Sequence, residues 1–92
     1  MKISIKGVFK KDTDRANDIE LLKALQSKIE QIERAQGIEH ITGLKLLRGY
    51  RTHYRIYVRS ENNSYRIGAI IRGHSVTLVR FLPRRIIYKR FP

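Results

Sequence analysis

Alternating arginine and tyrosine residues in the second half of the chain are the first candidates for a chemical site. In the segment from Tyr54 to Arg59, the residues Tyr54, Ile56 and Val58 occupy one set of alternate positions. Successive side chains of a strand point to opposite faces of a sheet, so the other set shares the second face. Two arginines that flank a tyrosine can hold a phosphate and stack a nucleobase. We therefore expect an RNA-binding strip made of Arg55, Tyr57 and Arg59.

Two other segments supply further cations and a second exposed tyrosine. Arg66 follows Tyr65 in the next predicted strand, and the C-terminal tail contains Arg84 and Tyr88. If the tail forms a helical turn, Arg84 and Tyr88 share one face because they are four residues apart. The three segments can then converge on one concave surface. The remaining basic residues that we expect to bind RNA there are Arg85 and Lys89.

Arginine and tyrosine suffice for the cleavage of RNA. The substrate supplies its own nucleophile, the 2′-hydroxyl, so the enzyme needs only geometry, charge stabilisation and proton transfer. Arginines can stabilise the negative charge that grows on the phosphorane. Nearby cations lower the pKa of a tyrosine from its ordinary value of about 10. Such a site needs no metal and leaves DNA intact, although solvated arginine is the simpler explanation for any one basic strand.

Other catalytic sites require residue types that are missing or scattered here. Residues 40–92 contain a single acidic side chain, Glu61, which argues against a two-metal nuclease or a paired-carboxylate site. His40, His53 and His74 lack the spacing of metal ligands, and the chain has no cysteine. There is no glycine-rich phosphate loop, and no serine has an identifiable base. We therefore expect no metal and no small-molecule cofactor.

Charge is distributed unevenly along the chain. The net charge of the whole chain is +12, of which residues 1–39 carry +1 and residues 40–92 carry +11. Ten of the twelve basic residues in the second part are arginines. The planar guanidinium suits bidentate phosphate contacts and stacking on bases, so this bias indicates a nucleic-acid partner. The alternatives are a solvated surface that keeps the protein in solution and a docking face for an acidic protein.

Length and hydropathy indicate one domain that spans residues 1–92. A chain of this size rarely divides into two domains, and a hydrophobic content of 41% supports a modest core. The lack of cysteine fits a reducing compartment. No apolar run approaches the roughly 20 residues of a membrane span, and the start of the chain lacks a secretory core. We therefore expect a soluble, cytoplasmic protein without a membrane partner.

The first part of the chain predicts a strand, a loop and a helix. Residues 1–9 alternate between apolar and polar types, which indicates a half-buried strand. Residues 10–17 are polar and indicate a loop or one short helical turn. Asn17 and Glu20 have the spacing of a capping box, and Gly37 is the expected end of the helix. The apolar stripe of this helix consists of Leu22, Leu25, Ile29 and Ile32, widened at its start by Ile19 and Leu21.

The second part of the chain follows the period of two that is typical of strands. Turn residues divide it at 60–64 and 72–75, and Pro83 ends the last strand. The remaining tail is expected to form about one helical turn. The order predicts an α+β fold, with an N-terminal strand, a helical segment and an antiparallel meander of three to four strands whose one face is covered by the helix. Strands are predicted at residues 44–47, 54–59, 65–71 and 76–82.

These segments resemble the RelE/ParE toxin superfamily over nearly the whole chain. Residues 76–92, VTLVRFLPRRIIYKRFP, are similar to family endings of the form V-x-F-V-R-F-L-H-R-K-D-I-Y-x-x-F-P. Residues 43–49 resemble the L-K-x-L-x-G segment that precedes the central strands, and residues 9–12 resemble the motif after the first strand. Residues 54–56 and 65–67 resemble the paired Y-R-I elements. The resemblance is strongest to the RelE-like ribonuclease branch.

The resemblance implies the toxin of a toxin–antitoxin pair. Such a toxin enters the A site of the ribosome and cuts the mRNA there without a metal. A cognate antitoxin blocks it by covering the basic groove or by displacing the C-terminal segment. By motif, Tyr88 matches the proton-transfer position, and Arg66 and Arg84 match the positions that bind the phosphate and the transition state. Arg55 matches a basic substrate-binding position.

Four features depart from the family pattern. Pro83 replaces a histidine, and Ile86 replaces an acidic or polar residue. The turn at residues 60–64 is longer than usual, and Tyr57 stands where some relatives carry a second basic residue. Two alternative functions stay open. The ParE branch shares this fold but inhibits DNA gyrase without cutting RNA, and a noncatalytic basic module would only bind RNA or the ribosome. Retention of the three catalytic positions favours the RelE branch.

Overall fold

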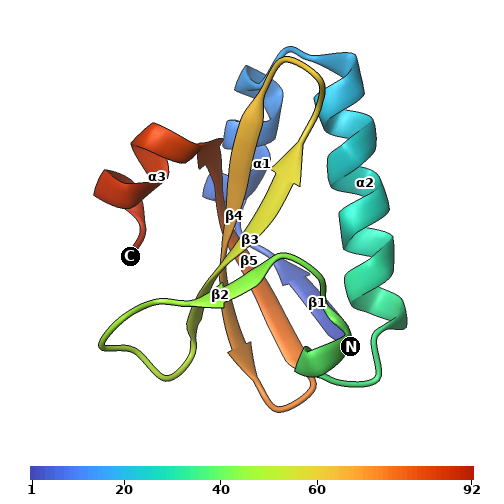
Figure 1. The fold of residues 1–92 in the computed structure, drawn as a ribbon, viewed down its shortest axis with the longest axis vertical. Helices are drawn as coiled ribbons and strands as arrows, with labels where there is room; N and C mark the ends of the chain where they lie inside the picture. The colour runs from blue at the N-terminus through green and yellow to red at the C-terminus, as the bar shows by residue number, and fades with distance from the viewer.

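Five strands form one mixed sheet in a computed structural model that describes residues 1–92 (Figure 1). Their order across the sheet is β1-β5-β4-β3-β2. The last four strands form an antiparallel meander, as predicted, whereas β1 lies parallel to β5 at one edge. The bounds of the strands are Lys2–Ile5 for β1, Leu44–Leu46 for β2, His53–Arg59 for β3, Ser64–Arg72 for β4 and Ser75–Pro83 for β5.

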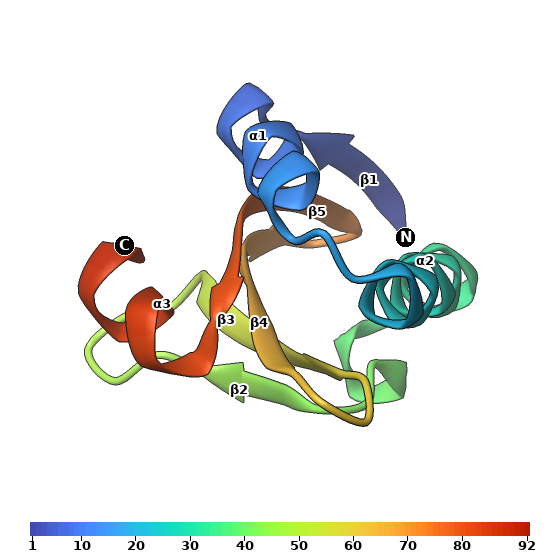
Figure 2. The same ribbon diagram turned by 90° about the horizontal axis from the view of Figure 1, so that it is seen from above.

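Helices cover both faces of this sheet. Two helices, α1 (Gly7–Arg15) and α2 (Ile19–Arg34), lie on one face, and a short 3₁₀ helix (Ile38–His40) follows them. The third, α3 (Arg84–Arg90), packs against β4 and β5 from the other side (Figure 2). No helix is both long enough and apolar enough to cross a membrane. The α+β prediction is therefore confirmed, and the tail forms a helix of its own that faces the surface opposite α2.

The N-terminal segment differs from its prediction. The strand ends at Ile5 rather than at Phe9, and the nine-residue helix α1 stands where a loop or one short helical turn was expected. Phe9 is only 2% exposed and packs against Phe81, with the ring centroids 5.9 Å apart. Most residues of α1 are polar, so its sequence pattern is weak, and contacts with β5 hold it in place. Tertiary packing, rather than the helix propensity of the local sequence, therefore determines the structure of this segment.

A buried carboxylate fixes α1 to β5. Asp12 is 4% exposed and accepts two hydrogen bonds from the guanidinium of Arg80, at 2.8 Å from Nε and 3.1 Å from Nη2. The backbone N–H of Phe81 donates a third hydrogen bond to it, at 2.9 Å. A buried charge is tolerated only when it is paired and hydrogen-bonded in this way. Arg80 thus serves the fold through its ion pair with Asp12.

The ends of α2 also correct the prediction. Asp18, not Asn17, is the N-terminal cap, and its side chain accepts a hydrogen bond from the N–H of Leu21 at 3.1 Å. Asn17 has a left-handed backbone with φ of 33°, which asparagine tolerates, and it links the two helices. The helix ends at Arg34, three residues before Gly37, because Ala35 is already extended.

The buried stripe of α2 is narrower than predicted. Leu21 is fully buried, whereas Ile19 is 73% exposed at the start of the helix, so its predicted place on the stripe was wrong. Leu22 and Ile29 are half-buried at the border of the stripe. The main core between the α1–α2 layer and the sheet includes Leu21, Leu25, Ile32, Ile56, Val58, Ile67, Leu78 and Phe81.

A second, smaller core lies on the opposite face and holds α3. Its buried members are Leu47, Ile87 and Phe91, and half-buried side chains of β4 and β5 surround them. Ile87 is fully buried and Phe91 is 3% exposed. These two side chains are therefore the apolar anchors that attach the C-terminal helix to the sheet.

Candidate active site

Strand β3 presents its arginine–tyrosine strip to the face that α3 occupies. Ile56 and Val58 are buried in the main core, so the alternate residues face the other way. The burial pattern confirms the predicted division of β3 into a core face and a polar face. The polar face carries Arg55, Tyr57 and Arg59.

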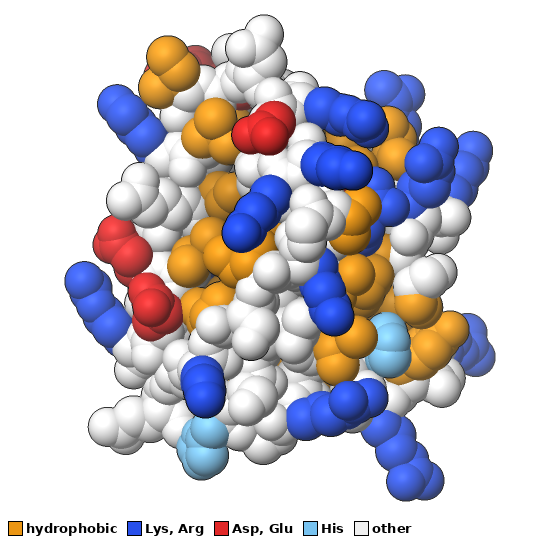
Figure 3. Space-filling model, turned by 180° about the vertical axis from the view of Figure 1, so that it is seen from behind, with side chains coloured by type: hydrophobic (Ala, Val, Ile, Leu, Met, Phe, Trp, Pro, Cys, Tyr) orange, Lys and Arg blue, Asp and Glu red, His pale blue; other side chains and the backbone are white.

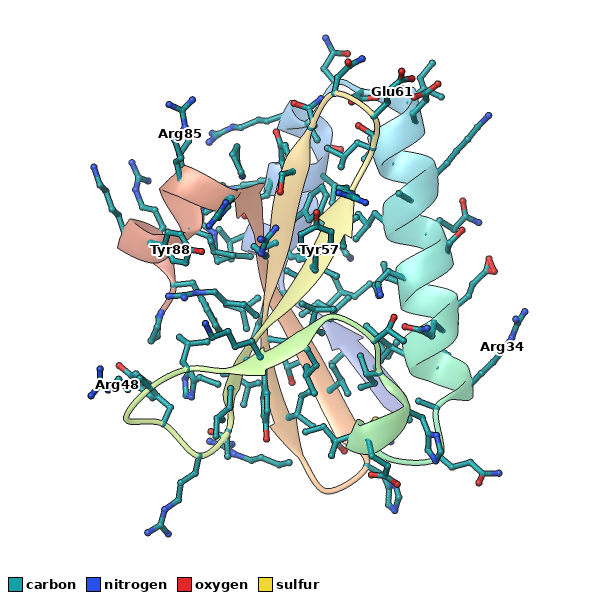
Figure 4. The ribbon with its side chains drawn as sticks, viewed as in Figure 1. Arg34, Arg48, Tyr57, Glu61, Arg85 and Tyr88 are labelled. Carbon is teal, nitrogen blue, oxygen red and sulfur yellow. The ribbon has the colours of Figure 1, made fainter.

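Helix α3 brings the predicted tail residues to this strip. Because Ile87 is anchored in the second core, the residue that follows it lies at the border between helix and sheet. Tyr88 is half-exposed there and lies on the sheet side of α3 (Figure 4). Arg84 lies one turn earlier, and its Nε donates a hydrogen bond to the Tyr88 hydroxyl at 3.4 Å. The expected spacing of four residues on one helical face is confirmed.

The ring of Tyr88 rests on a guanidinium from the sheet. The Cζ atom of Arg55 is 4.3 Å from the ring centroid, which is the geometry of a cation–π contact. The Nε atom of Arg55 is buried and donates to no protein atom, so stacking holds this guanidinium in place. Tyr88 is thus contacted by one arginine at its hydroxyl and by another at its ring.

A second arginine–tyrosine pair lies beside the first. Tyr57 and Arg66 are directly opposite each other in the β3–β4 ladder, and the Arg66 Cζ atom is 4.2 Å from the Tyr57 ring centroid. Arg66 is oriented by hydrogen bonds from its Nη1 atom to the Ser64 hydroxyl, at 3.0 Å, and to the Tyr65 carbonyl, at 3.1 Å. The guanidinium of Arg59 lies farther away, at 5.6 Å from the same ring.

These cations change the acidity of Tyr88. The hydrogen bond from Arg84 is the largest cause that lowers the pKa of Tyr88 below its ordinary value, and partial burial opposes it. The positive charges of Arg84, Arg66 and Arg55 lower this pKa further. The same hydrogen bond raises the pKa of Arg84, which therefore stays charged. Because its pKa is lowered, the half-exposed hydroxyl of Tyr88 loses its proton more readily than an ordinary tyrosine, and the resulting phenolate can act as a proton acceptor.

Two of the predicted RNA-binding residues lie outside this cluster. Arg85 and Lys89 are exposed on α3 and form no hydrogen bond or ion pair with its members, and Arg85 points outward from the helix in Figure 4. Basic side chains also gather on the rear of the molecule toward the edge where α3 lies, whereas acidic side chains lie along α2 (Figure 3). No group of three or more histidine, cysteine or carboxylate side chains has the arrangement of a metal site.

Sequence analysis did not identify several residues that hold the arginine–tyrosine cluster in place. Ser64 orients Arg66, and its place at the end of a turn is the only sign of that role. Phe91 packs so closely on Gly68 that a Cβ atom there would lie 2.5 Å from the ring. Gly68 follows the Y-R-I element that contains Arg66, and Phe91 lies in the C-terminal motif of residues 76–92. A direct packing contact therefore joins these two motifs.

Comparison with known proteins finds a similar curated toxin and a similar solved complex. The chain matches no sequence-family model. It is 29% identical over 93 residues to "Toxin RelE3" of Methanocaldococcus jannaschii, and the match covers 100% of both chains. Its fold is similar to that in the crystal structure of a RelB–RelE antitoxin–toxin complex from Methanococcus jannaschii, with a TM-score of 0.72 and 27% identity over 96% of this chain and 98% of the other. Full-length similarity in sequence, together with the similar fold, supports a RelE-like toxin.

Proposed function

We propose that this toxin is a ribosome-dependent endoribonuclease that cuts mRNA without a metal and thereby arrests translation in the cytoplasm. The observation that supports this most is the surroundings of Tyr88. Arg84 contacts its hydroxyl, Arg55 stacks on its ring, and Arg66 adds positive charge nearby. A proton acceptor beside several fixed cations is what cleavage through the 2′-hydroxyl of RNA requires.

In the proposed reaction, the phenolate of Tyr88 accepts the proton of the 2′-hydroxyl. The 2′-oxygen then forms a bond to phosphorus, and the bond from phosphorus to the 5′-oxygen breaks. The products are a 2′,3′-cyclic phosphate and a 5′-hydroxyl, which takes up a proton as it leaves. Arg66 and Arg84 stabilise the extra negative charge of the phosphorane. Arg55 binds the RNA backbone and holds the Tyr88 ring in its orientation.

The same face is the proposed target of a cognate antitoxin. The solved relative is part of a RelB–RelE antitoxin–toxin complex, and residues 40–92 of this chain carry a net charge of +11. A protein that covers this surface with acidic side chains would exclude RNA from it. We therefore expect a partner with an acidic, toxin-binding segment.

Inducible expression followed by mapping of mRNA ends tests this function. We expect growth arrest and new 5′-hydroxyl ends inside codons, only while ribosomes translate. Arg84→Ala removes a cation from the centre and is expected to lower the rate of cutting roughly 10²–10³-fold without abolishing it. Arg34→Ala is the matched control, because Arg34 lies on α2, far from the cluster (Figure 4). Arrest with intact mRNA and gyrase-linked DNA damage would instead identify a ParE-like inhibitor.

A further inference from the structure

Helix α3 has one side that serves neither the second core nor the candidate active site. Residues four positions apart share one side of a helix, so Ile86 and Arg90 lie together, on a different side from Arg84 and Tyr88. Ile86 is 44% exposed, which makes it one of the exposed large apolar side chains of the molecule. Arg90 is exposed as well, and both side chains line the same cleft.

This cleft lies between α1 and α3 and has a volume of about 300 Å³. The two helices pack against β5 from opposite faces of the sheet (Figure 2). On the rear of the molecule, apolar and basic side chains are interspersed toward the edge where α3 lies (Figure 3). Pro83 and Ile86, which stand where the family pattern has a histidine and an acidic or polar residue, both line the cleft. Its wall is therefore more apolar than the family pattern predicts.

The floor of the cleft is fixed without a ligand. It contains the ion pair of Asp12 with Arg80, whose atoms are 2.8 Å apart. Beside this pair, the fully buried ring of Phe81 contacts the rings of Phe9 and Tyr65, with centroid distances of 5.9 and 4.8 Å. The cleft is thus a preformed feature whose floor carries no net charge.

Two arginines leave the cleft with a positive charge. Arg15 lies in the last turn of α1, and Arg90 lies in the last turn of α3. Both are exposed, and neither forms a hydrogen bond or an ion pair. The only carboxylate that lines the cleft, that of Asp12, is already paired with Arg80. The cleft therefore attracts a ligand that carries negative charge.

The apolar wall favours a peptide over RNA as this ligand. The side chains of Leu82, Pro83 and Ile86 are aliphatic, and the aromatic ring of Phe81 is covered. Nucleobases need a flat aromatic or guanidinium surface for stacking, whereas aliphatic side chains pack around another apolar side chain. Carboxylates form strong hydrogen bonds with arginine. An apolar residue flanked by acidic residues matches both properties of the cleft.

We propose that the cleft between α1 and α3 is a docking site for an acidic segment of a partner protein. An apolar side chain of this segment packs on Ile86, and its carboxylates pair with Arg15 and Arg90. Arg84 and Tyr88 lie on another side of α3, so the segment can be bound while the arginine–tyrosine strip of β3 stays open to RNA. The site goes beyond the proposed function and does not depend on cleavage of RNA.

Fluorescence anisotropy with two labelled peptides tests the apolar part of the site. The probes are blocked pentapeptides of equal charge, Glu-Asp-Leu-Asp-Glu and Glu-Asp-Ser-Asp-Glu. We expect the leucine peptide to bind about tenfold more tightly, because only this peptide buries an apolar side chain. Ile86→Ser should remove this advantage. Ile5→Ser should keep it, because Ile5 is similarly exposed, at 42%, but lies outside the cleft.

Single arginine variants test the ionic part of the site. Arg15→Ala and Arg90→Ala should each weaken binding of both peptides about three- to fivefold, which is the effect of losing an exposed ion pair. Arg85→Ala, an equal charge change on another side of α3, should change the affinity less than about twofold. An equal loss in all three variants overturns the site, because the peptides then respond to net charge alone. Equal binding of the leucine and serine peptides overturns it as well.

Uncleavable RNA separates this cleft from the RNA-binding face. At physiological salt, which screens distant charges, a 2′-O-methyl uracil oligonucleotide should leave the leucine peptide bound. Release of the peptide by this RNA, or a larger loss of RNA affinity in Arg15→Ala than in Arg55→Ala, would assign the cleft to RNA and overturn the peptide site. None of these measurements involves cleavage. A toxin that cuts mRNA but fails them keeps the proposed function, and an inactive protein that passes them keeps the peptide site.

Discussion

Gly68→Ala should disable the centre without touching any of its reactive groups. A methyl group at this position of β4 would lie 2.5 Å from the Phe91 Cγ atom and 2.7 and 2.8 Å from the two Cδ atoms. Non-bonded carbon atoms normally approach to about 3.5–4.0 Å, so the ring must retreat by about 1 Å. Phe91 is 3% exposed, and its N–H donates to the Ile87 carbonyl at 2.9 Å. Its displacement therefore moves α3, with Arg84 and Tyr88 on it.

The size of the effect follows from this geometry. Overpacking of a buried contact typically costs about 1–3 kcal/mol in the free energy of unfolding, which leaves most small domains folded. A misplacement of about 1 Å at a reacting group can lower the rate about 10²-fold. We therefore expect a folded protein whose single-turnover cleavage rate on programmed ribosomes falls about 10- to 100-fold.

A second substitution distinguishes the steric contact from a general defect. Phe91→Leu removes the ring that the methyl group meets, so the double variant should cleave no more slowly than Phe91→Leu alone. Gly7→Ala is the matched control, because a Cβ atom on Gly7 meets nothing within 4 Å. Wild-type cleavage by Gly68→Ala, or effects of Gly68→Ala and Phe91→Leu that simply multiply, would refute the anchoring of α3 through this contact.

Three other predictions concern stability, pH and salt. Asp12→Ala leaves the side chain of Arg80 and the Phe81 N–H without their acceptor and should lower the free energy of unfolding in urea by about 3 kcal/mol. A loss below about 1 kcal/mol would contradict the stabilising role of the buried Asp12–Arg80 pair. The cleavage rate should rise with pH and level off below the ordinary tyrosine pKa of about 10, and Arg84→Ala should move this inflection upward, because the main cause of the lowered pKa of Tyr88 is lost; an unmoved inflection would assign it to another group. A plot of the logarithm of the RNA-binding constant against the logarithm of the salt concentration should have a slope of about −0.7 for each phosphate neutralised, and Arg55→Ala should reduce the size of this slope by about that amount. Binding that does not depend on salt would contradict electrostatic binding of RNA by the arginine-rich face.

Sequence reasoning succeeded where one periodic pattern decided the structure. The alternation around Ile56 and Val58 predicted which residues of β3 face the core, and the spacing of Arg84 and Tyr88 predicted their contact on α3. In both cases a repeat of two or about four residues directly determines the direction of a side chain. The meander and its turns followed from the same period.

Sequence reasoning failed where long-range contacts decide. Helix α1 has few apolar residues and is held by Phe9 and Asp12 against β5, about 70 residues later in the chain. The shift of the α2 cap to Asp18 depends on the left-handed backbone of Asn17. Two further contacts join separate segments: Arg55 stacks on Tyr88, and Phe91 packs on Gly68. A local sequence pattern therefore cannot predict them.

Single-turnover cleavage of mRNA on programmed ribosomes by Tyr88→Phe tests the central claim most directly. The variant keeps the ring that stacks on Arg55 and loses only the hydroxyl that Arg84 contacts. General acid–base groups contribute roughly 10²–10⁴-fold, so the rate should fall on that scale while ribosome binding persists and a chelator changes neither protein's rate. Cleavage by Tyr88→Phe at the wild-type rate would contradict the assignment of Tyr88 as the proton acceptor.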